Sequence, residues 1–182
     1  MNPLTADFPE LYRRHLHRHS EAGVNINHVV SVLGVYLCLF GLVDAVLWLG
    51  GVPGDRRGWL LLLPLVPYFL VMARTLPLRT LLALAAVVAG LWAVYWWGVA
   101  PLLEDASGWW RLVWVPLLPL CHQFQQVGHR FYTREFDMAE FAEKYPKGGP
   151  LFRLLALYEL PILVQYFLVG TGPLGDKQPI RG

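Results

Sequence analysis

Five long apolar runs constrain the fold of this 182-residue chain more than any other feature of its sequence. They cover roughly residues 29–49, 59–75, 81–99, 109–128 and 154–169. Hydrophobic residues make up 55% of the chain and charged residues only 15%, whereas soluble domains carry about 25% charged residues. The mean hydropathy is +0.42. Because an apolar helix of about 20 residues crosses a bilayer core, the sequence predicts an all-α membrane protein: one polytopic helix bundle of about five transmembrane helices.

The second apolar run is short for a span and contains Pro64 and Pro67, so we expect it to be kinked or lengthened by its flanks. Ahead of the first run, residues 3–23 predict an N-terminal interfacial helix. Asp7 and Glu10 form a capping-box-like start, and Gly23 suits the end of this helix.

Counts of lysine and arginine predict the orientation, because cytoplasmic loops are enriched in both residues. With five spans, nine basic residues share the side of the N-terminus: Arg13, Arg14, Arg18, Arg74, Arg79, Arg130, Arg134, Lys144 and Lys147. The other side keeps Arg56, Arg57, Lys177 and Arg181, with Arg111 near its boundary. We therefore expect a cytoplasmic N-terminus. The net charge of +2 is too small to indicate a nucleic-acid partner.

Histidines distant in the sequence are predicted to meet at the cytoplasmic face. His19 and His28 precede or begin the first run, and His129 ends the fourth run. His122 lies two helical turns before His129, on nearly the same helix face and about 10 Å deeper. Polar side chains in hydrocarbon are costly and normally face a cavity or a partner. We therefore expect His19, His28, His129 and His122 to be ligands of one metal site.

Amide and carboxyl side chains accompany these histidines. Gln125 lies in the same stretch of the fourth run, and Glu159 lies about 12 Å inside the last run; we predict catalytic roles for both. Asn25 and Asn27 stand beside His28, where amides can hold an imidazole ring in place. Imidazoles without thiolates suit zinc, iron, copper or nickel. Three or four nitrogens with an open coordination position would suit non-haem iron(II).

Structural roles for the same residues stay open. His28 and His129 would then be interfacial residues with ordinary hydrogen bonds, and His122 with Glu159 a buried pair that joins helices. For His15 and His17, in the basic segment before the first run, we favour binding to anionic lipid headgroups. Asp44 lies near the opposite face, so we expect it to cap or hydrogen-bond locally.

Two short segments carry a resemblance to a known family. His19 and His28 stand nine residues apart just before the first run, with Asn25 between them, and residues 125–129 read Gln-Gln-Val-Gly-His at the end of a later run. In these segments, and in the number and order of its spans, the chain resembles the membrane-bound 2-hydroxy fatty acid dioxygenases. These are iron(II)-dependent proteins of fungal sphingoid-base breakdown with bacterial relatives. The resemblance implies iron(II), dioxygen and oxidative loss of one carbon from the lipid.

The chain departs from that family pattern at several positions. Thr133 occupies the position where the family usually has a glutamate, four residues after the Gly-His histidine. The family's Arg-Pro-Ala continuation is replaced by the longer segment of residues 135–149. Asn25 is one residue from the commonest spacing, with Asn27 as the alternative, and His122 is an addition to the pattern.

Our first functional hypothesis is a membrane-embedded, metal-dependent oxygenase in a bacterial inner membrane, as a monomer or a homo-oligomer. A fatty acid or other lipid would enter from the bilayer, with its carboxylate near Arg130 or Arg18. A second hypothesis is a haem-binding or metal-binding carrier or a scaffold, with His28 and His122 as axial haem ligands. A third is a non-redox lipid-modifying enzyme, such as a cyclase or isomerase, in which Glu159 or Asp137 acts as acid and a histidine as base.

Overall fold

The computed structural model describes residues 3–19, 22–104, 108–132 and 150–170. Within these ranges the regular elements are all helices, with no strand, which confirms the predicted all-α class. η1 and η3 are 3₁₀-helices, and η2 and η4 are π-helices. The elements are η1 (Pro3–Thr5), α1 (Phe8–Arg18), α2 (Ala22–Leu49), α3 (Gly54–Leu60), α4 (Leu65–Thr75), α5 (Leu78–Ala93), η2 (Val94–Val99), α6 (Ala100–Glu104), η3 (Gly108–Val113), α7 (Trp114–Tyr132), α9 (Pro150–Val164) and η4 (Gln165–Val169).

Three helical segments in the described part of the chain are long and apolar enough to cross a membrane. They are Ala22–Leu49, Gly54–Thr75 and Leu78–Glu104. The second segment contains the expected break, since α3 ends at Leu60 and α4 begins at Leu65. Residues 54–58, which precede the predicted second span, are helical and lengthen this segment. The other two predicted spans do not reach the same length and apolarity, and the apolar helix Ala156–Val169 is shorter. The count of five spans is therefore not confirmed.

The first two helices begin and end at other residues than predicted. Asp7 caps α1 as expected, accepting a hydrogen bond from the Glu10 N–H at 3.2 Å. However, α1 ends at Arg18, and α2 already begins at Ala22, so Gly23 does not end the N-terminal helix. Asn25, Asn27 and His28 consequently lie within the first two turns of α2. Their side chains are fixed by a regular helix rather than by a loop.

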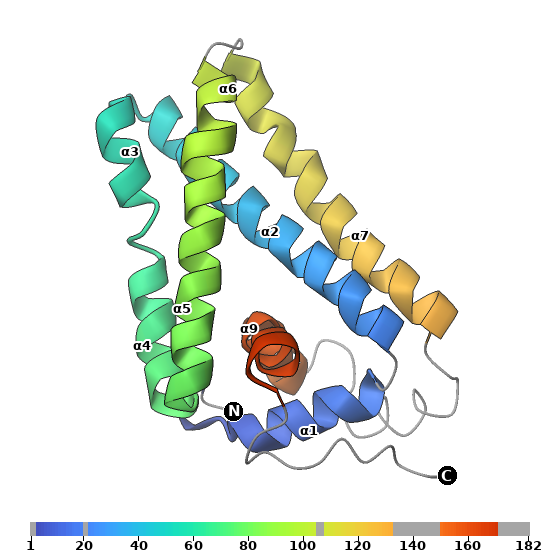
Figure 1. The fold of residues 1–182 in the computed structure, drawn as a ribbon. Coiled ribbons are helices and arrows are strands. Elements are labelled where there is room, and N and C mark those ends of the chain that lie inside the picture. Colours follow the sequence, from blue (N-terminus) through green and yellow to red (C-terminus); the bar gives the residue numbers. More distant parts are fainter. Residues whose placement is uncertain (1–2, 20–21, 105–107, 133–149, 171–182) are drawn as a thin grey trace.

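α2 and α7 form the most extensive helix pair of the fold and lie side by side, antiparallel, in Figure 1. Three close approaches recur at seven-residue intervals on both helices, at the pairs Asn27/Gly128, Gly34/Cys121 and Gly41/Trp114. A β-carbon added at Gly34 would lie 2.8 Å from the Cys121 sulfur, and one at Gly41 would overlap the Trp114 ring. A seven-residue repeat keeps one seam of each helix against its partner. Small residues in this seam let the two backbones approach closely.

α9 lies across the other helices rather than along them. Figure 1 shows α9 nearly end-on between α2 and α5, whereas α2, α5 and α7 are seen from the side. It also contacts α1, which crosses the same end of the bundle, through the fully buried rings of Phe8 and Tyr158, whose centroids are 6.3 Å apart. This arrangement closes one end of the bundle with α1 and brings the middle of α9 beside the start of α2.

The opposite end of the bundle contains a buried ionic network centred on Asp44. Its carboxylate accepts hydrogen bonds from Arg111 at 2.6 Å, from Tyr95 at 3.0 Å and from Arg57 at 3.1 Å. Arg57 also binds Glu104 at 2.8 Å. Asp44, Arg57 and Arg111 are each less than 5% exposed. Asp44 is near the opposite face as expected, but its bonds are not local: they join α2 to α3, η2 and η3.

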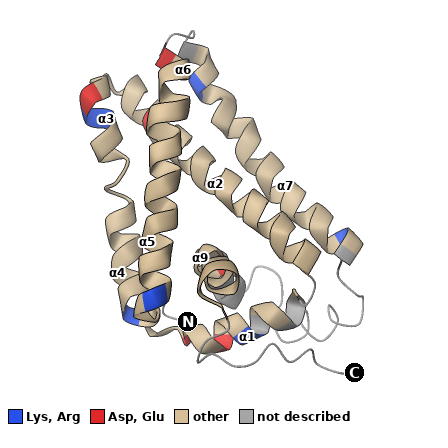
Figure 2. Ribbon diagram, in the orientation of Figure 1, with Lys and Arg blue, Asp and Glu red and all other residues tan. Residues whose placement is uncertain are grey.

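Charged residues lie mostly at the two ends of the bundle, as the blue and red parts of the ribbon show (Figure 2). Arg74 near the end of α4, Arg79 near the start of α5 and Arg130 near the end of α7 share the end that α1 closes. Most of the helical surface between the ends carries no charge in Figure 2. This distribution is the one expected of a protein whose middle faces hydrocarbon.

We predict that Asp44→Asn lowers the free energy of unfolding by roughly 3 kcal/mol, because it leaves the buried Arg111 guanidinium without its anion and the buried Arg57 with Glu104 alone. Thermal unfolding of the detergent-solubilised protein would measure the loss as a lower Tm. Asp55→Asn is the matched control, since Asp55 is exposed on α3. Equal melting of the two variants would contradict a stabilising role for the network.

Candidate metal centre

Three imidazoles from three helices meet at the end of the bundle that α1 closes. His19 is the residue that ends α1, His28 lies in the second turn of α2, and His129 lies in the last turn of α7. His19 and His28 are 5% and 3% exposed, and His129 is half-buried. One ring nitrogen of each lies within 4.8 Å of one from each of the others. The structure therefore confirms that histidines from the N-terminal segment and from the fourth run come together.

Two of the three nitrogen–nitrogen distances match those of ligands around one metal ion. The Nε2 atom of His129 lies 3.0 Å from that of His28 and 3.4 Å from that of His19. For ligands about 2.1 Å from a metal, nitrogens lie about 3.0 Å apart at a right angle and about 3.4 Å apart at the tetrahedral angle. The cluster thus has the geometry to hold a metal ion on three nitrogens, with further coordination positions left for other ligands.

The ring of His19 is oriented by the end of its own helix. Both its backbone N–H, at 2.8 Å, and its Nδ1–H, at 3.0 Å, donate to the carbonyl oxygen of His15. Because a carbonyl can only accept, the proton of a neutral His19 is on Nδ1, and the lone pair is on Nε2. Asn25 supports this turn by donating to the His19 carbonyl at 2.8 Å and accepting from the His15 ring at 3.0 Å.

The ring of His28 is oriented by Glu159. The Glu159 carboxylate lies 2.6 Å from Nδ1 of His28, and the Gln125 amide nitrogen lies 2.9 Å from the same atom and donates to Glu159. Because an ionised carboxylate can only accept, the shorter contact places the His28 proton on Nδ1. A carboxylate behind a ligating histidine fixes the tautomer and raises the basicity of the other ring nitrogen. Glu159 and Gln125 thus lie on the side of His28 that faces away from the other two rings. We interpret them as positioning residues rather than as the catalytic groups that the sequence suggested.

Two chemical arrangements fit a cluster in which both His19 and His28 present lone pairs to His129. In the first, the Nε2–H of His129 donates to His28, and the three rings form a hydrogen-bonded structural group. In the second, a cation replaces that proton and binds all three lone pairs. The outward-facing Nδ1–H groups of His19 and His28 are the arrangement that metal-binding histidines need.

His122 does not join this cluster. It is exposed, and its ring is not among those that converge. The sequence placed His122 and His129 on nearly the same face of one helix, and a helix repeat of seven residues supports that. At the level of His129, however, this face is covered by His19 at the end of α1, whereas at the level of His122 it is exposed. The predicted metal-ligand role of His122 is therefore not supported.

The Gln-x-x-Gly-His segment has a physical explanation in the α2–α7 seam. Gln125 is buried against Glu159, and a β-carbon at Gly128 would overlap the side chain of Asn27. Gly128 therefore lets the end of α7 come close enough for His129 to reach His28. Asn27, which we expected to hold an imidazole, instead packs against Gly128, and its buried Oδ1 has no hydrogen-bond partner among the described residues.

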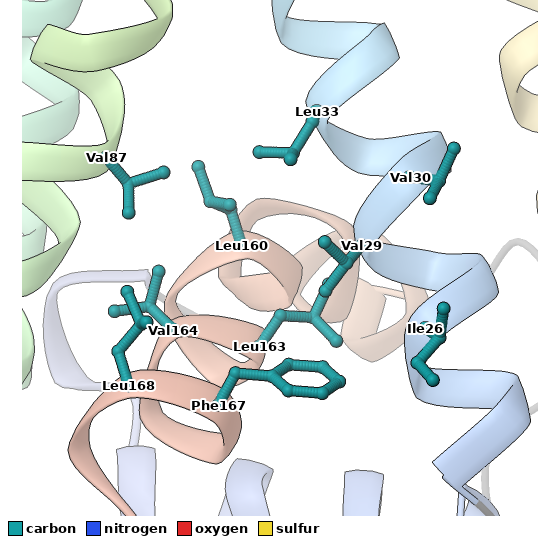
Figure 3. Close-up of a pocket in the computed structure, with 10 residues that line it drawn as sticks. All are labelled: Ile26, Val29, Val30, Leu33, Val87, Leu160, Leu163, Val164, Phe167 and Leu168. Carbon is teal, nitrogen blue, oxygen red and sulfur yellow. The ribbon is translucent and has the colours of Figure 1, made fainter.

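An apolar pocket of about 300 Å³ lies beside the cluster (Figure 3). It opens between α2, α5 and the α9–η4 segment, and apolar side chains line it: Ile26, Val29, Val30, Leu33, Val87, Leu160, Leu163, Val164, Phe167 and Leu168. Val29 directly follows His28, and Leu160 directly follows Glu159. The pocket and the metal centre are therefore built on adjacent residues of the same two helices.

The role predicted for His15 is wrong, and several other residues named from the sequence lie outside the described part of the structure. His15 is 6% exposed and stacks on His19 with ring centroids 4.0 Å apart, so the headgroup role that we favoured for it is wrong. Its i, i+4 spacing from His19 was the signal for this contact. The side chains of His17 and Arg18 lie outside the described part of the structure, as do Thr133 and Asp137.

Comparison of the chain with protein-family models, with curated proteins and with solved structures finds no match.

We predict that the purified wild-type protein binds about one transition-metal ion per chain, and that His129→Ala weakens this binding more than about 100-fold, beyond the usual effect of losing an outer-shell partner. His122→Ala is the matched control on the same helix and retains the metal. Elemental analysis and metal titration measure both. Equal metal content in the two variants would leave only the hydrogen-bonded arrangement.

We predict that Gly128→Ala also lowers metal content, although it removes no ligand, because the added methyl group separates α7 from Asn27. Gly90→Ala is the control: it adds the same methyl group to an apolar helix at a position with no atom within 4 Å. Thermal unfolding of both variants accompanies the metal measurement. Full metal binding by Gly128→Ala would show that the close approach is not needed for the cluster.

Proposed function

We propose that this protein is a membrane-embedded, metal-dependent oxygenase that acts on a fatty acid or a related lipid. The single observation that carries the proposal is the convergence of His19, His28 and His129 at metal-ligand spacing next to an apolar pocket. The resemblance to the 2-hydroxy fatty acid dioxygenases supports the reaction class, because it rests on His19, His28 and the segment that contains His129.

Iron(II) is the metal that we propose for the centre. The donor set consists of imidazole nitrogens without thiolates, which suits iron among several metals. Three protein nitrogens leave positions open for dioxygen and for the polar end of a lipid. When bound, iron would supply the activation of dioxygen. The protein would supply the ligand geometry, through the bonds that hold His19 and His28, and a largely buried setting that limits access of water.

The apolar pocket supports a lipid as the substrate. Its volume of about 300 Å³ is at the lower limit of ordinary ligand pockets. Its lining offers no charged or hydrogen-bonding side chain, so it suits a hydrocarbon chain and not a polar metabolite. Ile26 and Val30 at its rim are more than half exposed. In a membrane this rim faces the acyl region, and a lipid can enter sideways without crossing water.

The orientation predicted from basic residues would place this centre at the cytoplasmic face of a bacterial inner membrane. The end that α1 closes also carries Arg74, Arg79 and Arg130, in agreement with the positive-inside rule. Arg130 is exposed on the last turn of α7, next to His129, where it is available to a lipid carboxylate.

A non-redox enzyme is the second candidate, because the contact between Glu159 and His28 at 2.6 Å is also an acid–base pair. The haem hypothesis has less support, since it needs His28 and His122 to face one porphyrin, and His122 lies outside the cluster. Dependence on oxygen and on metal separates the oxygenase from the non-redox enzyme.

We predict that the iron(II)-loaded protein in lipid nanodiscs consumes dioxygen when it is given a 2-hydroxy fatty acid and releases an acid that is one carbon shorter. An oxygen electrode and mass spectrometry measure the two changes. His129→Ala loses the activity, and His122→Ala retains it. Turnover that persists without oxygen and with a chelator would instead identify the non-redox enzyme.

The pocket is tested in the same assay with Val30→Trp, which fills its rim and leaves the histidines in place. We expect a higher KM for long-chain substrates with unchanged metal content. Val46→Trp is the matched control, an exposed valine near the other end of α2. An equal KM in both variants would place the lipid elsewhere.

A further inference from the structure

α7 has one face that the described elements leave uncovered although it is polar. The face with Trp114, Cys121 and Gly128 packs against α2. A second face carries exposed apolar side chains, namely Leu120, Phe124, Val127 and Phe131. Between them lies a third face, here called the α7 polar face, formed by His122, Gln123 and Gln126, and all three side chains are exposed. Arg130 follows one turn later at the end of α7, where a long charged side chain extends to the aqueous surface.

The register of the α2–α7 seam sets the depth of the α7 polar face. Counted from the pair Asn27/Gly128, Gln126 is level with Val29 and His122 is level with Leu33. Both α2 residues belong to a helix that is apolar enough to cross a membrane. On α2 the side chains exposed at this level are apolar, with Val30 56% exposed. The polar face of α7 therefore stands at a depth where the neighbouring surface suits hydrocarbon.

The polar groups of this face need partners. Within the described part of the chain, the side chains of His122, Gln123 and Gln126 make no hydrogen bond. An amide in hydrocarbon without a hydrogen bond costs several kcal/mol. Residues 133–149 directly follow α7 and are one candidate cover, but seven of these 17 residues are charged. Such a sequence is poorly suited to the acyl region of a bilayer.

We infer that the α7 polar face is the interface of a homodimer, occupied by the same face of a second copy of this chain. Two copies in one membrane share their orientation, so a two-fold axis along the membrane normal brings residues of equal depth together. Gln126 then meets Gln126 of the second copy. A glutamine amide both donates and accepts, so this contact satisfies both side chains reciprocally. Polar side chains between membrane helices stabilise association in this way.

The dimer also leaves the apolar pocket accessible. The pocket opens between α2, α5 and α9, whereas the α7 polar face belongs to a helix that does not line it. The apolar face of α7, with Phe124 and Leu120, stays in contact with lipid. The interface therefore does not depend on the proposed oxygenase function.

Cysteine cross-linking in native membranes tests the dimer. Gln126→Cys and Gln123→Cys are each introduced into a Cys121→Ala background, since the Cys121 thiol on the same helix is only partly buried, whereas Cys38 is fully buried. A short bismaleimide is expected to convert both variants largely into covalent dimers. Phe124→Cys and Leu120→Cys, on the lipid-facing side of the same helix, are the matched controls and are expected to stay monomeric.

Monomers at all four positions would overturn the inference, as would equal cross-linking at all four or adducts with a different protein. A second variant gives an independent measurement. Gln123→Leu with Gln126→Leu removes the amides without disturbing the seam, and native mass spectrometry is expected to show loss of the dimer with metal content unchanged. A dimer that survives this double substitution would also contradict the inference.

Discussion

The antiparallel seam between α2 and α7 is the contact on which the rest of the structure depends. Three close approaches at seven-residue intervals fix the register of the two helices over most of their length. That register brings His129 to His28 at one end. At the other end the same register brings Arg111 to Asp44, which lies one helical turn beyond Gly41. A shift of either helix would separate both pairs, so the two polar centres are coupled through one apolar interface.

The Asp44 network and the histidine cluster differ in how their polar atoms are arranged. Around Asp44 two guanidinium groups and a phenol surround one carboxylate, so the charges are largely compensated, and the network joins α2 to the three short elements α3, η2 and η3. Around His129 the hydrogen bonds of His19 and His28 run outward, and their Nε2 atoms face that of His129. A buried, compensated ion pair holds helices together, whereas converging lone pairs can bind a cation. This contrast is why we interpret the first centre as structural and propose a metal site for the second.

Much of the fold could be predicted because hydropathy and helix chemistry are local. Apolar runs identified the membrane character, Asp7 and Glu10 marked the start of α1, and the prolines marked the break between α3 and α4. The number of spans could not be predicted in the same way. α9 is apolar, but Figure 1 shows that it lies across α2 and α5, and its direction depends on what it packs against. Hydropathy measures preference for an apolar environment, and it carries no information on direction.

For the candidate site, the sequence by itself determined the residue types, the spacing of His19 and His28, and the presence of a glycine before His129. It could not separate His122 from His129, which share a helix face, nor assign His15 to the buried cluster. The tertiary structure decided both, because α1 covers the α7 face only at the level of His129 and brings His15 inward with it. Helical periodicity fixes the angle of a side chain about its own axis. Only the packing of other helices decides whether a side chain at that angle meets a metal centre, a partner protein or lipid.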